Sequence, residues 1–90
     1  MKTRTRVGHT RWKAILYEPG QVQGYDDRAI AIVVGCRVTA VVGSSVHYTT
    51  SDNQHYIAGV GYWQQRTLPT FRKARADAKR KIKEWEDAHP

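Results

Sequence analysis

The residues from Thr70 to Pro90 carry an apolar pattern with the period of an α-helix. Apolar side chains recur there at steps of three or four, at Phe71, Ala74, Ala78, Ile82 and Trp85. At about 100° per residue, these steps place all of them on one face of a helix. Pro69 ends the preceding segment, and Thr70 is a residue type that often caps a helix N-terminus. The pattern therefore predicts an amphipathic helix over residues 70–88 that packs on the rest of the chain.

A row of cations accompanies this apolar face, at Arg72, Arg75, Lys79 and Lys83. The first turns of the predicted helix are basic and its last turns are acidic. The helix macrodipole favours the opposite order, by roughly 0.3–1 kcal/mol for each well-placed charge. Two interpretations fit this order. The row is either an ordinary solvated surface or a set of charges retained for an acidic partner.

Upstream of the helix, four segments have the composition and alternation of β-strands: 10–17, 29–42, 46–51 and 55–63. In 29–42, every even-numbered residue is apolar, whereas the odd-numbered residues include Arg37 and Thr39. Such alternation is typical of a strand with one face in the core. Gly35 leaves open a bend in one long strand or a tight turn between two strands. The alternation of apolar residues continues through Gly35 without a shift, which favours one bent strand.

These elements predict an α+β fold. We expect a three- to four-stranded antiparallel β-sheet, connected as a meander, with the C-terminal amphipathic helix packed on one face. The other face is expected to be open to solvent or to a partner, and Trp12 and Trp85 are expected to anchor the core. A chain of 90 residues suits one domain. We expect residues 10–90 to form it and residues 1–9 to be a flexible basic arm.

The charge balance favours an acidic partner. Fifteen Lys and Arg against eight Asp and Glu give a formal net charge of +7. This excess of positive charge favours nucleic acid or an acidic protein as the partner. An anionic membrane surface is a less favoured partner. The single cysteine, Cys36, excludes a disulfide within the chain and fits a reducing compartment. No apolar run approaches the roughly 20 residues of a membrane span. We therefore expect a cytoplasmic protein with no membrane partner.

No motif points to catalysis or to a bound metal. The four histidines do not lie at metal-ligand spacings from one another or from Cys36. Cys36 lies in an apolar run, where cysteine usually behaves as a small buried hydrophobe. Asp26 and Asp27 have no third acid near them in the sequence. We therefore expect no enzyme activity, no metal site and no cofactor.

The aromatic residues of the predicted strands give a stronger functional signal. Trp12, Tyr48, Tyr56, Tyr62 and Trp63 all fall on those segments. Interleaved with basic residues, exposed aromatic rings can stack on nucleic-acid bases. The competing interpretation is that these aromatic residues pack against one another across strands and in the core. We expect at least half of them to be buried.

Residues 70–85, which directly follow predicted strands, have the spacing T-x3-A-x3-A-x3-I-x2-W. This spacing resembles the join between sheet and helix in two groups of proteins. One is the arm-binding N-terminal domain of tyrosine recombinases, whose sheet enters the DNA major groove. The other is the HicB-type antitoxin fold, whose proline-rich strand end is absent here. The resemblance is one of apolar spacing, and we assign no family from it. What it implies is DNA contact through a sheet.

The sequence thus predicts a small basic, non-enzymatic nucleic-acid-binding protein, with DNA expected rather than RNA. The residues expected to contact nucleic acid are Arg4, Arg6, Arg11, Lys13, Arg37, Arg72, Arg75, Lys79 and Lys83. The alternative is a small accessory or inhibitor protein, of the kind that bacterial viruses encode, that binds an acidic protein surface. Both a monomer and a homodimer fit the sequence.

Overall fold

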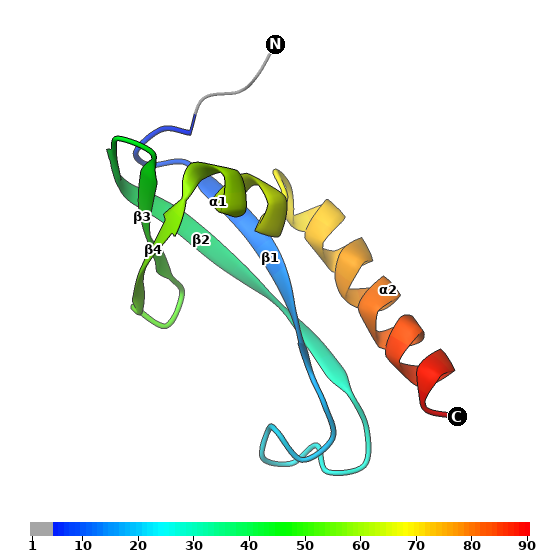
Figure 1. Cartoon of the computed structure of the whole chain (residues 1–90). Coiled ribbons are helices and arrows are strands. Elements are labelled where there is room, and N and C mark those ends of the chain that lie inside the picture. The colour runs from blue at the N-terminus through cyan, green and yellow to red at the C-terminus, as the bar shows by residue number, and fades with distance from the viewer. Residues whose placement is uncertain (1–4) are drawn as a thin grey trace.

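The computed structural model describes residues 5–90, which form one antiparallel sheet and two helices (Figure 1). In chain order the elements are β1 (Thr10–Tyr17), β2 (Ile30–Val42), β3 (Ser45–Thr50), β4 (His55–Gly59), α1 (Val60–Arg66) and α2 (Phe71–Ala88). The predicted α+β class is confirmed. The strands lie in the order β1-β2-β3-β4, so the predicted meander is confirmed as well.

The strand β2 runs through Gly35 without a break, as the single phase of its apolar residues predicts. Gly35 lies opposite Trp12 of β1. A Cβ atom at this position would lie 2.9 Å from Cζ3 of Trp12, so the glycine makes room for the indole ring. The irregularity in pairing falls further along, where the register between β2 and β3 shifts between Val38 and Ala40.

The helix α1 differs from the prediction, which extended the last strand to residue 63. The strand β4 ends at Gly59, and Val60–Arg66 is helical. The local sequence is a poor helix former, because it contains a β-branched residue and Gly61. Tertiary packing decides in favour of the helix, since it turns the indole of Trp63 into the core, where its exposed fraction is 1%.

The principal core lies between α1 and one face of the sheet. Its buried members are Cys36, Val38, Val46, Tyr48 and Trp63. The sheet face that the sequence suggested to be open is therefore covered in part by α1. The expectation that Trp12 and Trp85 anchor the core is wrong, because both are only partly buried and Trp63 lies at the centre.

The helix α2 covers the opposite face, along β1 and β2. Successive residues of a strand point to opposite faces, so Trp12 faces away from the core that contains Cys36, the pairing partner of Arg11. Phe71 of α2 packs edge-on against Trp12, with ring centroids 5.3 Å apart. Ala74 and Ala78 are buried, and their small side chains let the helix lie close to the strands. The two helices thus lie on opposite faces of one sheet.

The outer edge of β1 is covered by the chain between the helices. The backbone N–H of Trp12 donates to the carbonyl of Leu68 over 2.9 Å, and the N–H of Leu68 donates back over 2.6 Å. Further along the strand, the ammonium of Lys81 donates to the carbonyl of Ala14 over 2.9 Å. These contacts fix α2 against the sheet and satisfy polar groups of an edge strand.

Candidate nucleic-acid interface

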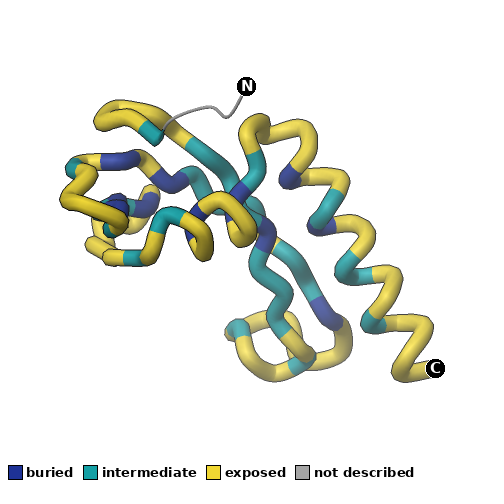
Figure 2. The backbone as a smooth tube through the Cα atoms, turned by 45° about the horizontal axis from the view of Figure 1, so that its top comes forward, coloured by how far each residue is buried: buried dark blue, intermediate teal, exposed yellow. Residues whose placement is uncertain are grey.

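The four cations predicted along α2 lie on one flank of that helix. Arg72, Arg75, Lys79 and Lys83 are all exposed, and Figure 2 shows the outward side of α2 exposed along its length. Steps of three and four residues bring their side chains into one row. Within residues 5–90, none of the four forms an ion pair. Glu86 borders the row at its C-terminal end.

The ion pairs of α2 lie on its other flank. Arg80 bonds both Asp77 and Glu84, with 2.8 Å from its Nη1 to Oε1 of Glu84. Lys81 also approaches Asp77, at 3.5 Å. Burial opposes ionisation of Asp77, but the hydrogen bond from Arg80 and the positive charge of Lys81 outweigh it and lower the pKa of the carboxyl. Acidic and basic groups are therefore paired on one side of the helix, and a row of uncompensated cations is presented on the other.

Arg11 has a different environment from the cations of α2. Its Nε donates to Oγ1 of Thr67 over 2.6 Å, and its Nη2 donates to the carbonyl of Thr67 over 2.8 Å. Thr67 is the C-terminal cap of α1, where a positive charge is favourable. Burial lowers the pKa of this guanidinium, which still remains charged at neutral pH. The side chain thus fastens α1 to β1, and within residues 5–90 two of its nitrogen atoms are bonded to the fold, unlike those of the α2 row.

Arg37 lies on the same sheet face as α2, because it pairs with Thr10, two residues before Trp12. It is exposed beside a shallow groove that Trp12 and Gly35 also line. Lys81 reaches the outer edge of β1, so the opposite flank of α2, with Arg75, lies on the side toward β2. Arg37 and the row on α2 thus belong to one side of the molecule.

Residues 8 and 9, at the end of the N-terminal segment, are hydrogen-bonded to β2. The N–H of Gly8 donates to the carbonyl of Val38 over 2.8 Å, and Val38 donates to the carbonyl of His9 over 2.9 Å. Arg6 is exposed just before these contacts. Arg4 lies outside the described residues, so its predicted role remains a prediction from the sequence.

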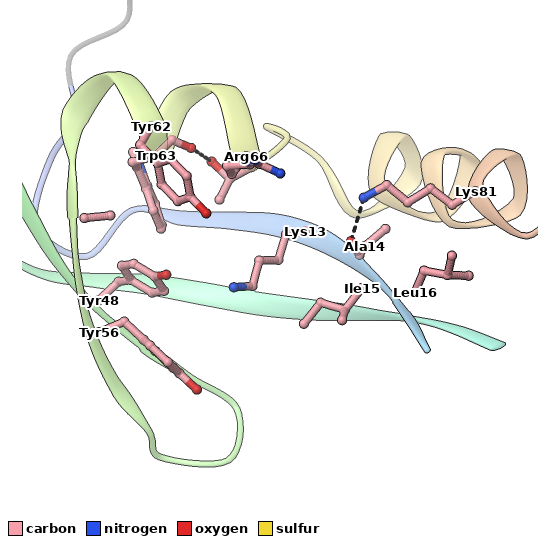
Figure 3. A pocket seen from close by; sticks show the side chains of 12 residues that line it. Lys13, Ala14, Ile15, Leu16, Tyr48, Tyr56, Tyr62, Trp63, Arg66 and Lys81 are labelled. Atoms are coloured by element: carbon pink, nitrogen blue, oxygen red, sulfur yellow. Dashed lines mark hydrogen bonds between the residues drawn. The ribbon is translucent and has the colours of Figure 1, made fainter. Parts of the chain in front are cut away.

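Lys13 lies on the other face, in a cleft of about 450 Å³ between α1 and the strands. Figure 3 shows Tyr62 and Trp63 on the side of α1, Tyr48 and Tyr56 on the strands opposite, and Lys13 between them. Arg66 also lines this cleft. It was not among the residues predicted to bind, because α1 was not predicted from the sequence. The spacing of Tyr62 and Arg66, four residues apart, would have indicated their proximity on a helix.

Three observations concern side chains of the types that catalysis and metal binding use. Among residues 5–90, no group of three His, Cys, Asp or Glu side chains is placed to hold a metal ion. His47 and His55 lie near each other on adjacent strands, with ring centroids 5.5 Å apart. Burial raises the pKa of the Cys36 thiol, which disfavours the reactive thiolate.

Neither helix in residues 5–90 is both long and apolar enough to cross a membrane.

No family model, no curated protein and no solved structure matches this chain.

Proposed function

We propose that this protein binds nucleic acid without catalysing a reaction on it, and that the exposed flank of α2 contacts the phosphates. The observation that carries the proposal is the row of four exposed cations on α2, none of which forms an ion pair within residues 5–90. On the opposite flank of the same helix, Asp77 and Glu84 are paired with Arg80. Basic side chains that are free of internal partners can replace the counterions of a phosphate backbone.

The length of the row suits a nucleic-acid backbone. With a rise of about 1.5 Å per residue, the eleven-residue step from Arg72 to Lys83 extends over roughly 16 Å. One strand of duplex DNA carries a phosphate about every 3.4 Å along its axis, so the four cations can each meet a different phosphate. Arg37, on the same side of the molecule, and Arg6 add positive charge. Such contacts position the protein and do not specify a base sequence.

We propose DNA in preference to RNA because residues 70–85 resemble the join between sheet and helix in the arm-binding domain of tyrosine recombinases, which binds DNA. We place the activity in the cytoplasm, where a free thiol such as Cys36 stays reduced.

A second candidate function has its own observation. Among residues 5–90, β4 is an edge strand with no strand paired on its outer side, and its residues Tyr56 and Ile57 are 42% and 63% exposed. An exposed strand edge can accept a strand from another protein. The protein would then be an accessory or inhibitor protein that binds an acidic protein surface, with α2 supplying charge complementarity.

Charge reversal on α2 tests the first proposal. In the double variant Arg75→Glu with Lys79→Glu, we expect the affinity for a labelled DNA duplex to fall at least tenfold at low salt, measured by fluorescence anisotropy. An RNA duplex of the same sequence, measured in parallel, tests the preference for DNA. The matched control is Arg28→Glu with Lys73→Glu, which changes the net charge equally at two exposed residues outside the row.

The control variant is expected to lose much less affinity than the row variant. Equal losses in the two variants would show that net charge alone drives binding and would remove the assignment to α2. If the unmodified protein binds no nucleic acid at low salt, single strands included, the acidic-protein candidate replaces the first proposal.

A further inference from the structure

The cleft between α1 and the strands has a composition that the proposed contacts of α2 do not explain. Its charged lining residues are Lys13, Arg66 and Lys81, and no Asp or Glu lines it within residues 5–90. The ammonium of Lys81 is already bonded to the carbonyl of Ala14. Lys13 and Arg66 form no ion pair among the described residues, so both remain available to an anion.

Aromatic rings form a continuous series from the core to the floor of this cleft. Trp63 contacts Tyr48 with ring centroids 4.7 Å apart, and Tyr48 stacks on Tyr56 at 5.4 Å with an angle of 22° between the planes. Tyr48 is buried, whereas Tyr56 is 42% exposed. On the side of α1, Tyr62 is 56% exposed. Two tyrosine rings therefore reach solvent in one cleft (Figure 3), and that of Tyr56 is supported by the buried ring of Tyr48.

A cation lies over each of the two exposed rings. The ammonium of Lys13 lies 5.6 Å from the ring centroid of Tyr56, and the guanidinium of Arg66 lies 5.1 Å from that of Tyr62. A flat apolar surface next to a positive charge matches the two parts of a nucleotide, a base and its phosphate. The volume of about 450 Å³ is within the roughly 300–1,000 Å³ of small-molecule sites.

We propose that this cleft binds an unpaired nucleotide of a single-stranded nucleic acid. The base stacks against Tyr62 and Tyr56, and Lys13 and Arg66 move from over these rings to bind the adjoining phosphate. The base must be unpaired, because the bases of a duplex are stacked on their neighbours and do not offer their faces to side chains. This inference rests on the proposed function and extends it to a second face of the molecule, since the cleft lies across the sheet from α2.

The test compares single-stranded and duplex DNA in variants of one tyrosine. The probe is labelled oligothymidylate of about 12 nucleotides, a length within the site sizes of ~4–16 nucleotides found for single-strand-binding domains. Stacking on one aromatic ring changes affinity by roughly 5- to 150-fold, so Tyr62→Ala should weaken oligothymidylate binding by a factor in that range. Affinity for the duplex should stay unchanged. Tyr62→Phe keeps the ring and should bind like the unmodified protein.

The chain offers a matched control outside the cleft. Tyr25 is exposed, and the guanidinium of Arg28 lies 5.2 Å from its ring centroid, which copies the pairing of Tyr62 with Arg66. Tyr25→Ala should leave the affinity for oligothymidylate unchanged. Arg66→Gln, as an independent variant, should weaken oligothymidylate binding. Circular dichroism checks that each variant is folded.

The outcomes separate this inference from the proposed function. If the unmodified protein binds duplex but not oligothymidylate, the proposed function stands and the cleft assignment is overturned. Equal effects of Tyr62→Ala and Tyr25→Ala on oligothymidylate binding also overturn it. Binding of neither probe at low salt overturns the proposed function itself, and the inference with it.

Discussion

Arg11 and Arg75 have the same side chain but very different surroundings. Arg11 bonds Thr67 at the end of α1, whereas Arg75 is exposed and forms no ion pair within residues 5–90. The sequence placed both in one predicted set, because nothing in a basic residue's immediate neighbours shows which remote group it will meet. The partners of Arg11 lie 53 and 56 residues away. By contrast, the burial of Cys36 followed directly from the alternation of apolar residues along its strand.

This difference gives a prediction about stability. Arg11→Ala should lower the free energy of unfolding by about 1–3 kcal/mol, because it leaves the partly buried polar groups of Thr67 without their charged donor. Arg75→Ala, at an exposed position, should change that free energy by less than about 0.5 kcal/mol. Urea unfolding followed by tryptophan fluorescence measures both values. If the two variants are equally stable, Arg11 is not the structural residue that we infer.

At the scale of elements, the sequence predicted the four strands and α2 but not α1. The period-two and helical patterns were long enough to identify β2 and α2, whose predicted bounds differ from the observed ones by one residue at most at each end. Residues 60–66 were too short and too poor in helix-forming residues for such a pattern. The helical state depends on burying Trp63 against β2 and β3, a contact that only the assembled fold shows. The cleft was missed for the same reason, because α1 forms one of its walls.

The paired flank of α2 makes a prediction about acid stability. In the folded protein the pKa of Asp77 is lowered, so its ionised form stabilises the fold above the unfolded-state pKa of about 3.9. That contribution is lost as the pH falls through the folded-state pKa, which lies below this value. Asp77→Asn should therefore be less stable than the unmodified protein at about pH 6, and the difference should shrink as the pH falls to about 2.

Urea midpoints of the two proteins across this pH range measure the effect. A difference that stays constant with pH would mean that the Asp77 carboxylate does not supply the stability through its charge. Glu84→Gln is a suitable comparison, because Glu84 is an exposed partner of the same Arg80 and, within residues 5–90, pairs with that cation alone, whereas Asp77 pairs with both Arg80 and Lys81.

At the scale of the whole molecule, two surfaces lie across one sheet from each other. One is the row of cations on α2 with Arg37 nearby, and the other is the cleft with Tyr62 and Lys13. The net charge and the row could be predicted from the sequence, because helical spacing alone brings those four side chains together. The separation of Lys13 from Arg37 could not, because it depends on which helix covers which face. The two surfaces together predict a protein that contacts a phosphate backbone on one side and an unpaired base on the other.

The salt dependence of nucleic-acid binding tests the central claim most directly. Fluorescence anisotropy of a labelled DNA duplex, titrated with the unmodified protein at several salt concentrations, gives the slope of log affinity against log salt. Each neutralised phosphate contributes about 0.9 to this slope, so four contacts from α2 predict a decrease of about 3.6 per decade of salt. A slope near zero, or no binding at low salt, would contradict the claim that the row on α2 contacts phosphates.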